Sequence, residues 1–230
     1  MFDIDGTLLS TAGAGRRALA QAFFDLFGFT AAMDGVRLHG ATDPKILEQV
    51  FQKHRGNSPS AAESEAVLAR YLALLALELE RTQGGYQVLP GGEALVSALV
   101  ATGRHAVGLA TGNVEAGARL KLRPGGLDQK FRFGGFGSDA GDRAELVAHA
   151  IRRGQAELAQ LGRPAATPQE IFVLGDTEQD VMAARRTGVV AIGILAGSGV
   201  PDDLRQSQPD LLCESMWDPA LWAALSLERP

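Results

Sequence analysis

Hydrophobic residues recur at helical spacing in one part of the chain and form short, strand-like runs in another. Between residues 14 and 86, three stretches place apolar side chains three or four positions apart, the spacing of one helix face. These stretches cover 16–27, 43–54 and 63–81. Because no strand-like run separates them, this part of the chain predicts a small unit built only of helices.

After residue 87, short apolar runs alternate with helical patterns. The runs cover 105–110, 171–174, 189–195 and 210–213, and the helical patterns cover 91–102, 114–123, 142–161, 178–187 and 219–227. Alternating strands and helices build a parallel sheet covered on both faces. The chain therefore predicts an α/β fold, with a Rossmann-like doubly wound parallel sheet core (1–13 and 87–230) and an inserted all-helical cap domain (14–86).

Two acids stand at the end of the first apolar segment, in the string Met-Phe-Asp-Ile-Asp-Gly-Thr. On a strand, Asp3 and Asp5 point to the same face, and Gly6 lets the backbone turn away. A plain turn also uses Asp and Gly, but this string arises by chance in roughly one such chain in several hundred. One carboxylate can attack a substrate while the other moves protons. Only Met1 and Phe2 precede Asp3, so either the natural chain begins upstream or the first strand is unusually short.

A second acidic pair follows a later apolar run. Asp176 stands directly after the run 171–174, and Asp180 lies one helical turn further on. An acid in the first turn complements the helix dipole, which explains Asp180 but not an acid at the strand end. Because ligands of parallel sheets bind at the carboxyl ends of the strands, this pair and the acids at 3 and 5 are predicted to converge as a divalent-metal site.

Two further features suit an anionic ligand. The string Thr-Gly-Asn at 111–113 follows an apolar strand and opens a helix, where free N–H groups and a hydroxyl bind anions, although a plain capped loop also fits. A site rich in carboxylates needs a fixed cation. Arg143 is predicted to supply it, because a cation at a helix N-terminus is locally unfavourable. The alternatives are a surface Arg143 paired with Asp139 or Asp142, or Lys130 in the same role.

Four polar residues of the helical unit lie near a turn: His39, Thr42, Asp43 and Lys45. They are candidates for contact with the far end of a substrate, and Thr42 is predicted among the substrate-binding residues. Helix capping by Thr42 or Asp43 explains the same residues equally well.

Composition narrows the choice of partners and compartment. The net charge of −5 argues against nucleic acid, and no stretch approaches the ~18 apolar residues of a spanning helix. The single cysteine, Cys213, excludes an internal disulfide framework and a cysteine-based zinc site. There is no signal-peptide pattern at the start. We therefore expect a cytoplasmic protein, monomer or homodimer, with neither nucleic acid nor membrane as partner.

Taken together, these residues resemble the haloacid dehalogenase-like hydrolase superfamily, in its phosphoglycolate phosphatase-like branch. The motifs are Asp-Ile-Asp-Gly-Thr at 3–7, Thr-Gly-Asn at 111–113, a basic residue at 143 and Gly-Asp-Thr-Glu-Gln-Asp at 175–180. They occur in the right order over essentially the whole chain. The sequence departs from the pattern in its short first strand and in Arg143, where the family often has lysine.

The resemblance implies a phosphatase that hydrolyses a small phosphorylated metabolite, similar to phosphoglycolate, through an aspartyl-phosphate. It makes Asp3 the nucleophile, and Asp5 the general acid that later acts as base. The implied cofactor is Mg²⁺, held by the Asp3 carboxylate, the Asp5 carbonyl and Asp176, with Asp180 in support.

The resemblance also implies how phosphate is bound. Thr111, Gly112 and Asn113 would hold phosphate oxygens, and Arg143 would offset their charge. A sugar-phosphate mutase remains open as an alternative on the same scaffold, because it uses similar residues. Asp5 argues against a haloacid dehalogenase, because carbon–halogen cleavage has no oxygen leaving group and needs no acid to protonate one. A phosphonate hydrolase or a binding module on a retired enzyme scaffold is less well supported by these residues.

Overall fold

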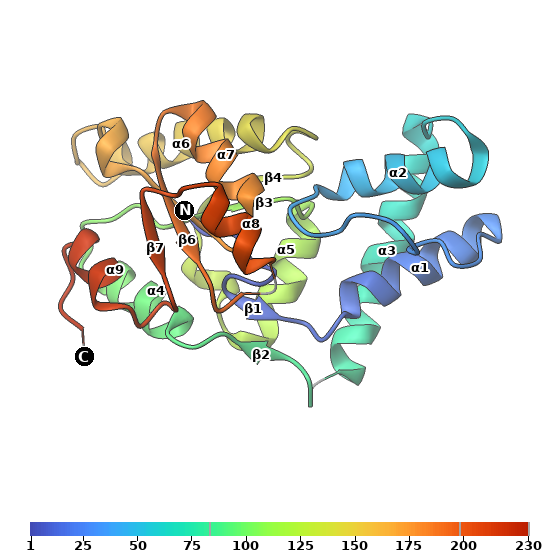
Figure 1. Cartoon of the computed structure of the whole chain (residues 1–230), viewed down its shortest axis with the longest axis horizontal. Helices are drawn as coiled ribbons and strands as arrows, with labels where there is room; N and C mark the ends of the chain where they lie inside the picture. The colour runs from blue at the N-terminus through green and yellow to red at the C-terminus, as the bar shows by residue number, and fades with distance from the viewer. Residues whose placement is uncertain (83, 198, 230) are drawn as a thin grey trace.

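The computed structural model describes residues 1–82, 84–197 and 199–229 and shows a sheet-based core beside a group of three helices (Figure 1). We call the three helices, with the linkers between them, the cap; they lie together at the right of Figure 1. The cap helices are α1 (Ala14–Phe27), α2 (Asp43–Arg55) and α3 (Ala61–Arg81). No strand lies between them in the part of the chain described, as the apolar spacing predicts.

Local signals in the sequence set the ends of the cap helices. Ser60 and Glu63 form a reciprocal capping box at the start of α3, which satisfies backbone donors that have no partner within the helix. Helix α2 ends at Gly56 in the left-handed conformation. The apolar faces of the helices pack around buried aromatic residues such as Phe23 and Phe51. The cap therefore has a hydrophobic core of its own.

Five strands and the N-terminal segment form the main sheet. The strands are β3 (Gly108–Thr111), β4 (Phe133–Phe136), β5 (Phe172–Gly175), β6 (Val190–Ile194) and β7 (Leu211–Cys213). Phe2 pairs in parallel with Leu109 on one side and with Leu174 on the other, so the N-terminal segment lies between β3 and β5. The order across the sheet is β4, β3, N-terminal segment, β5, β6, β7, and all pairs are parallel.

Helices cover both faces of this sheet, and the alternation of side chains along each strand decides what each face buries. Leu109, Leu174 and Ile192 pack with the helices of one face. These helices are α4 (Gly92–Ala101), α5 (Glu115–Leu122) and α9 (Pro219–Ala224). Ala110 is the neighbour of Leu109 in β3, and Val173 is the neighbour of Leu174 in β5. Their side chains therefore point to the other face of the sheet and pack there. The helices there are α6 (Arg143–Gln160), α7 (Glu178–Thr187) and α8 (Pro201–Gln206).

A small antiparallel pair of strands connects core and cap. Strand β1 (Leu9–Ser10) carries the chain out of the core, β2 (Gln87–Val88) brings it back, and Leu9 pairs with Val88. Both connections to the cap therefore run side by side. No helix among the described residues is long and apolar enough to span a membrane.

The sequence pattern missed several elements of the core. Strand β4 has the sequence Phe-Gly-Gly-Phe, whose glycines have low strand propensity, and β1 and β2 are two residues long. Helix α8 was also not predicted, and neither were the 3₁₀ turns Arg123–Gly125, Asp128–Lys130 and Pro168–Glu170. These elements are too short to show a period, so only their tertiary packing reveals them.

Candidate active site

The N-terminal segment delivers Asp3 and Asp5 to the carboxyl edge of the sheet. The Asp3 amide donates to the Leu174 carbonyl at 2.9 Å, which fixes Asp3 next to the end of β5. Ile4 is fully buried in the core. The chain then turns at Gly6, whose φ of 81° favours glycine. The Asp5 side chain is 42% exposed and that of Asp3 only 8%, so Asp5 stands nearer the mouth of the site.

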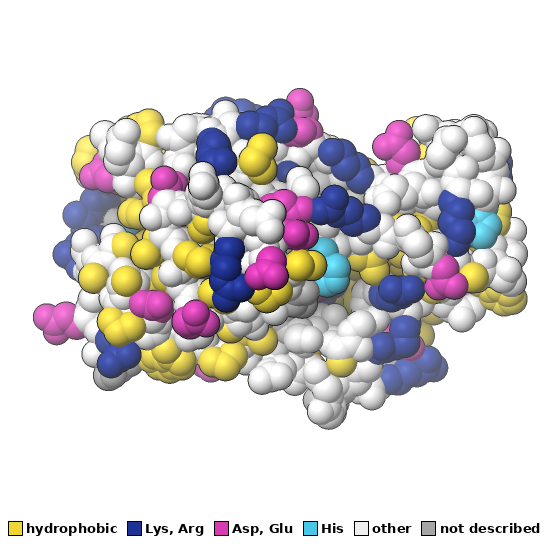
Figure 2. Space-filling view, viewed as in Figure 1, with side chains coloured by type: hydrophobic (Ala, Val, Ile, Leu, Met, Phe, Trp, Pro, Cys, Tyr) yellow, Lys and Arg dark blue, Asp and Glu magenta, His cyan; other side chains and the backbone are white. Residues whose placement is uncertain are grey.

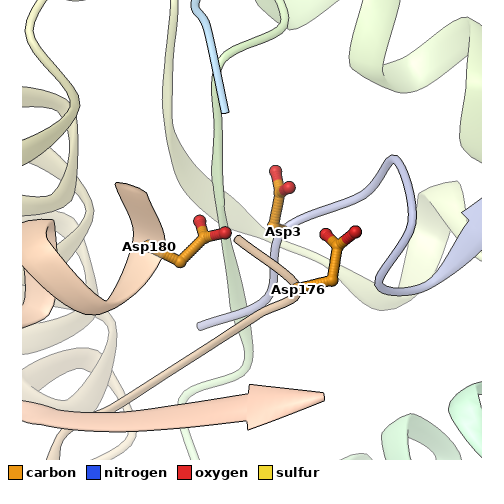
Figure 3. Close-up of side chains that lie close together, drawn as sticks. All are labelled: Asp3, Asp176 and Asp180. Carbon is orange, nitrogen blue, oxygen red and sulfur yellow. The ribbon is translucent and has the colours of Figure 1, made fainter. Parts of the chain in front are cut away.

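Three carboxylates meet at this edge (Figure 3). Asp3, Asp176 and Asp180 each bring an oxygen to within 4.8 Å of the other two, and all three residues are buried. The Thr7 hydroxyl (3.0 Å) and the Gly199 amide (2.8 Å) donate to opposite oxygens of Asp176. One oxygen of Asp180 accepts from the amide and the hydroxyl of Thr177. Three of the four acids that the sequence predicts to converge thus meet, from two distant strand ends. The carboxylate of the fourth, Asp5, lies outside this cluster and pairs with Lys121.

Arg143 joins this cluster from the first residue of α6. Its Nη2 lies 3.0 Å from Asp3 Oδ1 and 2.6 Å from Asp180 Oδ1, and its Nη1 donates to the Gly40 carbonyl of the cap linker at 3.3 Å. The guanidinium is buried, with 8% of the side chain exposed. The two acids considered as alternative partners bind other arginines: Asp139 with Arg153 and Asp142 with Arg186. Lys130 instead donates to Ser97.

The cluster carries more negative charge than one arginine neutralises. Burial raises the pKa of Asp3 to about 7, although Arg143 acts in the opposite direction. Burial also raises the pKa of Asp176 to about 6, and the charge of Asp180 adds to the rise. Because buried carboxylates that attract protons also attract metal ions, the residues present fit a hard divalent cation.

A second network surrounds Asp5. Lys121 Nζ donates to Asp5 Oδ2 at 2.7 Å and to Asn113 Oδ1 at 2.6 Å, and Asn113 Nδ2 donates to the same Asp5 oxygen at 2.8 Å. Desolvation disfavours a charged Asp5, but Lys121 and Asn113 outweigh it and hold the pKa of Asp5 below its usual range. Asp5 Oδ1 has no hydrogen-bond partner among the residues described, so this oxygen is available to a ligand.

Lys121 lines the candidate site, and the sequence interpretation missed it. A lysine within a helical pattern is normally interpreted as a solvent-exposed cation, yet only 7% of the Lys121 side chain is exposed. A signal was present, because Lys121 is three residues from Ala118 and next to Leu122, and both are fully buried. Position 121 therefore belongs to the buried face of α5, and a lysine on a buried face needs a partner of opposite charge.

The loop at 111–113 lies beside this network and under the cap linker. Thr111 is fully buried, and its hydroxyl accepts from Asn113 Nδ2 at 2.9 Å. A Cβ on Gly112 would lie 2.4 Å from the Ala41 carbonyl, so only glycine permits the approach of the cap. The Asp43 amide donates to the Gly112 carbonyl at 2.8 Å. The cap is thus in direct contact with the loop that the sequence predicts to bind an anion.

A pocket of about 280 Å³ opens above these residues between core and cap. It is lined by predicted site residues (Asp3, Asp5, Thr111, Gly112, Asn113 and Arg143) and by cap residues including Arg16, Leu19, Leu38 and Tyr71. Thr42 does not line it. Its hydroxyl donates to the Gly141 carbonyl at 2.9 Å, so the substrate-binding role of Thr42 stays a prediction without a supporting contact. Asp176 and Asp180 do not line the pocket but lie next to Asp3, within the carboxylate cluster.

Comparison with known proteins identifies a matching family and a similar fold. A protein-family model described as haloacid dehalogenase-like hydrolase matches residues 1–194. A probable phosphatase, IndB, from Dickeya dadantii is 26% identical over 215 residues, with 94% of this chain and 88% of the relative covered. A phosphoglycolate phosphatase from Xanthomonas campestris is 28% identical over 227 residues, with 96% of each chain covered. The crystal structure of a hydrolase from Pseudomonas syringae superposes with a TM-score of 0.69 at 24% identity, covering 99% of this chain and 98% of that one.

Proposed function

The chain belongs to the haloacid dehalogenase-like hydrolase family, and we propose that it is a Mg²⁺-dependent phosphatase acting on small phosphate monoesters through an aspartyl-phosphate. The observation that carries the proposal is that buried Asp3 meets both Arg143 and Asp176, and that Asp3, Asp5 and Arg143 line one pocket. Phosphoryl transfer depends mainly on positioning and on charge stabilisation, which this set of residues supplies. The relatives named as phosphatases support the same class.

In the first step, Asp3 attacks the phosphorus atom of the ester. Arg143 holds Oδ1 of Asp3, so the other carboxylate oxygen is free to form the new P–O bond. The bond from phosphorus to the alcohol oxygen breaks, and its electron pair stays with that oxygen. Thr111, Gly112 and Asn113 line the pocket, and in this proposal they hold phosphate oxygens, with the helix that follows contributing its dipole.

Asp5 moves the protons of both steps. Its Oδ2 is held by Lys121 and Asn113, which leaves Oδ1 for proton exchange with the substrate. The approach of an anionic phosphate raises the proton affinity of a neighbouring carboxylate, so Asp5 can carry the proton that the leaving alcohol needs. Once the alcohol has left, the ionised Asp5 accepts a proton from the water that hydrolyses the aspartyl-phosphate.

The proposed cation belongs at the carboxylate cluster. Asp3 and Asp176 would hold it, with the Asp5 carbonyl. Asp180 orients Arg143 by accepting a hydrogen bond from its Nε and by an ion-pair contact with its Nη2. A bound Mg²⁺ neutralises charge on the phosphate oxygens. Without a cation, the buried carboxylates would repel a phosphate dianion, since like charges in a poorly solvated site interact strongly.

We expect Mg²⁺ to raise the melting temperature more at about pH 7.5 than at about pH 5. Asp3 and Asp176 have raised pKa values when folded, about 7 and about 6. Between pH 4 and pH 7 the metal-free folded state therefore binds more protons than the unfolded state, and these two groups lower its stability as the pH rises. Mg²⁺ replaces the protons and removes that cost. Thermal unfolding with EDTA or Mg²⁺ across this pH range measures the difference.

The matched variants for this experiment are Asp176→Asn and Asp202→Asn. The first removes a proposed ligand, and most of the Mg²⁺ effect should disappear. The second makes the same change at an exposed acid with 82% of its side chain accessible, and the Mg²⁺ effect should persist. A Mg²⁺ effect that is independent of pH, or equal in both variants, would contradict the assignment.

Lys121→Met should slow hydrolysis by roughly ten- to a hundredfold. Without Lys121, the pKa of Asp5 rises and its carboxylate loses the contact that fixes Oδ2. A base with a higher pKa is ionised only at higher pH, so the acidic limb of the pH–rate profile should move upward. Lys121→Arg should recover part of the activity, and Lys130→Met, which removes a cation away from the pocket, should behave as wild type. An unmoved pH profile in Lys121→Met would reduce Lys121 to a structural role.

The direct test of the function is phosphate release from a panel of small monoesters with and without Mg²⁺. A pocket of about 280 Å³ suits compact esters, and we propose a phosphoglycolate-like monoester as the best substrate. Metal-dependent release that is greatest for the compact esters is the expected result. Transfer of the phosphoryl group to a second sugar without net release would instead identify a mutase, and no reaction with any ester would reject the proposal.

A further inference from the structure

A second hollow lies where the cap meets the core, next to the active-site pocket but separated from it by the linker at 40–42. We call it the junction pocket; its volume is about 280 Å³. The cap contributes Arg37, Lys45 and Gln49 to its lining, and the core contributes Arg143, Gln179 and Arg186. Figure 2 shows Lys and Arg side chains and a histidine gathered on this face, between the core at the left and the cap at the right.

The junction pocket brings four cationic side chains together in a protein whose net charge is −5, and Asp142 is the one carboxylate residue among its described lining. Three of the four have acidic partners; Arg143 pairs with Asp3 and Asp180 in the carboxylate cluster. The Asp142 carboxylate is already occupied, because it accepts the amides of Ala144 and Glu145 and pairs with Arg186 at 2.9 Å. Arg37 pairs with Glu178. Lys45 is exposed, and its ammonium group has no hydrogen-bond or ion-pair partner in the part of the chain that the structure describes.

The start of α2 is only partly satisfied: the Asp43 amide donates to the Gly112 carbonyl at 2.8 Å, and Asp43 is the acid of the first turn. Thr42 occupies the N-cap position but makes no side-chain cap bond, because its hydroxyl donates to Gly141 instead. Pro44 has no N–H group, and Lys45 places a cation in the first turn, where the helix dipole disfavours it. Thr42, Lys45 and Gln49 share the face of α2 that lines the pocket. An anion in the pocket would therefore meet the first turn of α2 at Lys45 and pair with its ammonium group.

We propose that the junction pocket binds a phosphate group, either inorganic phosphate or that of a small phosphorylated metabolite. Arginine and lysine side chains from opposite walls suit the several acceptor oxygens of this anion. Arg37 and Lys45 belong to the cap, whereas Arg186 belongs to α7 of the core. A bound phosphate therefore connects the two and stabilises the cap on the core. This binding is independent of the catalytic function proposed above.

The test is thermal unfolding of the metal-free protein in EDTA during titration with inorganic phosphate. Without a cation, the carboxylates of the active site repel phosphate, so the junction pocket is the favoured site. We expect a saturable rise in melting temperature that sodium chloride of equal ionic strength does not produce. In Lys45→Met the apparent dissociation constant should weaken by roughly tenfold, and Lys45→Arg should restore it.

Arg152→Met is the matched control. Arg152 is an exposed residue of α6 that lines neither pocket, so its loss makes the same change in net charge without touching the site. Phosphate binding should persist in this variant. The proposal is overturned if Arg152→Met weakens binding as much as Lys45→Met, if chloride gives the same stabilisation, or if phosphate stabilises the protein only after Mg²⁺ is added.

A second arm identifies the source of the phosphate group. A small monoester such as glycerol 3-phosphate is titrated in EDTA at the same concentrations as inorganic phosphate. Tighter binding of the monoester identifies a phosphorylated metabolite as the ligand, and tighter binding of inorganic phosphate identifies the free anion. In either case, the tighter ligand must bind more weakly to Lys45→Met than to the wild type. Equal binding to both would place the ligand elsewhere and overturn the proposal.

Discussion

Asp3→Asn will abolish phosphate release and leave the protein folded. The variant replaces the proposed nucleophile with an amide that cannot form an aspartyl-phosphate, so we expect a loss of kcat on the order of 10³-fold or more. The fold should persist, because Asp3 lies at the end of the sheet and its charge is costly when buried: its pKa is raised to about 7. In metal-free buffer near pH 7.5 the neutral amide should leave the melting temperature unchanged or higher.

The measurement combines phosphate release with thermal unfolding of the same preparation. Asp202→Asn makes the same chemical change at an exposed position and should retain full activity. Near-wild-type turnover in Asp3→Asn would reject the nucleophile and with it the covalent mechanism. Inactivity together with unfolding would point to a structural role for Asp3 instead, and the metal-free melting temperature separates that outcome from the expected one.

Arg143→Met should cost both activity and stability. The guanidinium is the buried cation between Asp3 and Asp180, and it also holds the cap linker through Gly40. Removing it leaves two buried carboxylates without their partner, which destabilises the folded state by about 3–5 kcal/mol. The phosphoryl group also loses its fixed positive charge, so we expect kcat/KM to fall on the order of 10²- to 10³-fold.

Urea unfolding and steady-state kinetics measure the two effects of Arg143→Met. Mg²⁺ should restore part of the lost stability, because a cation at the same cluster offsets the unpaired carboxylates. Arg143→Lys keeps the charge but reaches fewer partners, so its losses should be intermediate. Arg205→Met breaks an exposed ion pair with Asp202 and should change stability by about 1 kcal/mol or less. Equal stability losses in Arg143→Met and Arg205→Met would contradict the buried role of Arg143.

The long elements of the fold could be read from the sequence because periodicity is a local property. The helix predicted at 178–187 is confirmed as Glu178–Thr187, and that at 43–54 as Asp43–Arg55. Strand β4 was not readable, because Phe-Gly-Gly-Phe has no strand pattern of its own. It exists because Gly134 and Gly135 fit closely against neighbouring side chains and against the backbone of α6.

Within the candidate site, too, some features could be predicted from the sequence and others could not. The sequence placed Asp3, Thr111 and Asp176 at the ends of apolar strands, and the parallel sheet brings such ends to one edge. Arg143 was predicted from its unfavourable place at a helix start, but only the structure shows that it pairs with Asp3 and Asp180. Lys121 was not predicted as a site residue, because its partner Asp5 lies 116 residues away in the sequence.

The sequence by itself determined the α/β core, the helical cap and the identity of the acids, because strand ends, helix periods and turn residues are set by neighbouring residues. Tertiary structure alone decided which charges meet. Lys121 reaches Asp5, Arg143 bridges two carboxylates, and Lys45 faces a basic pocket. Electrostatic interactions depend on distance and on the removal of water, and both are fixed only when segments far apart in the chain pack together.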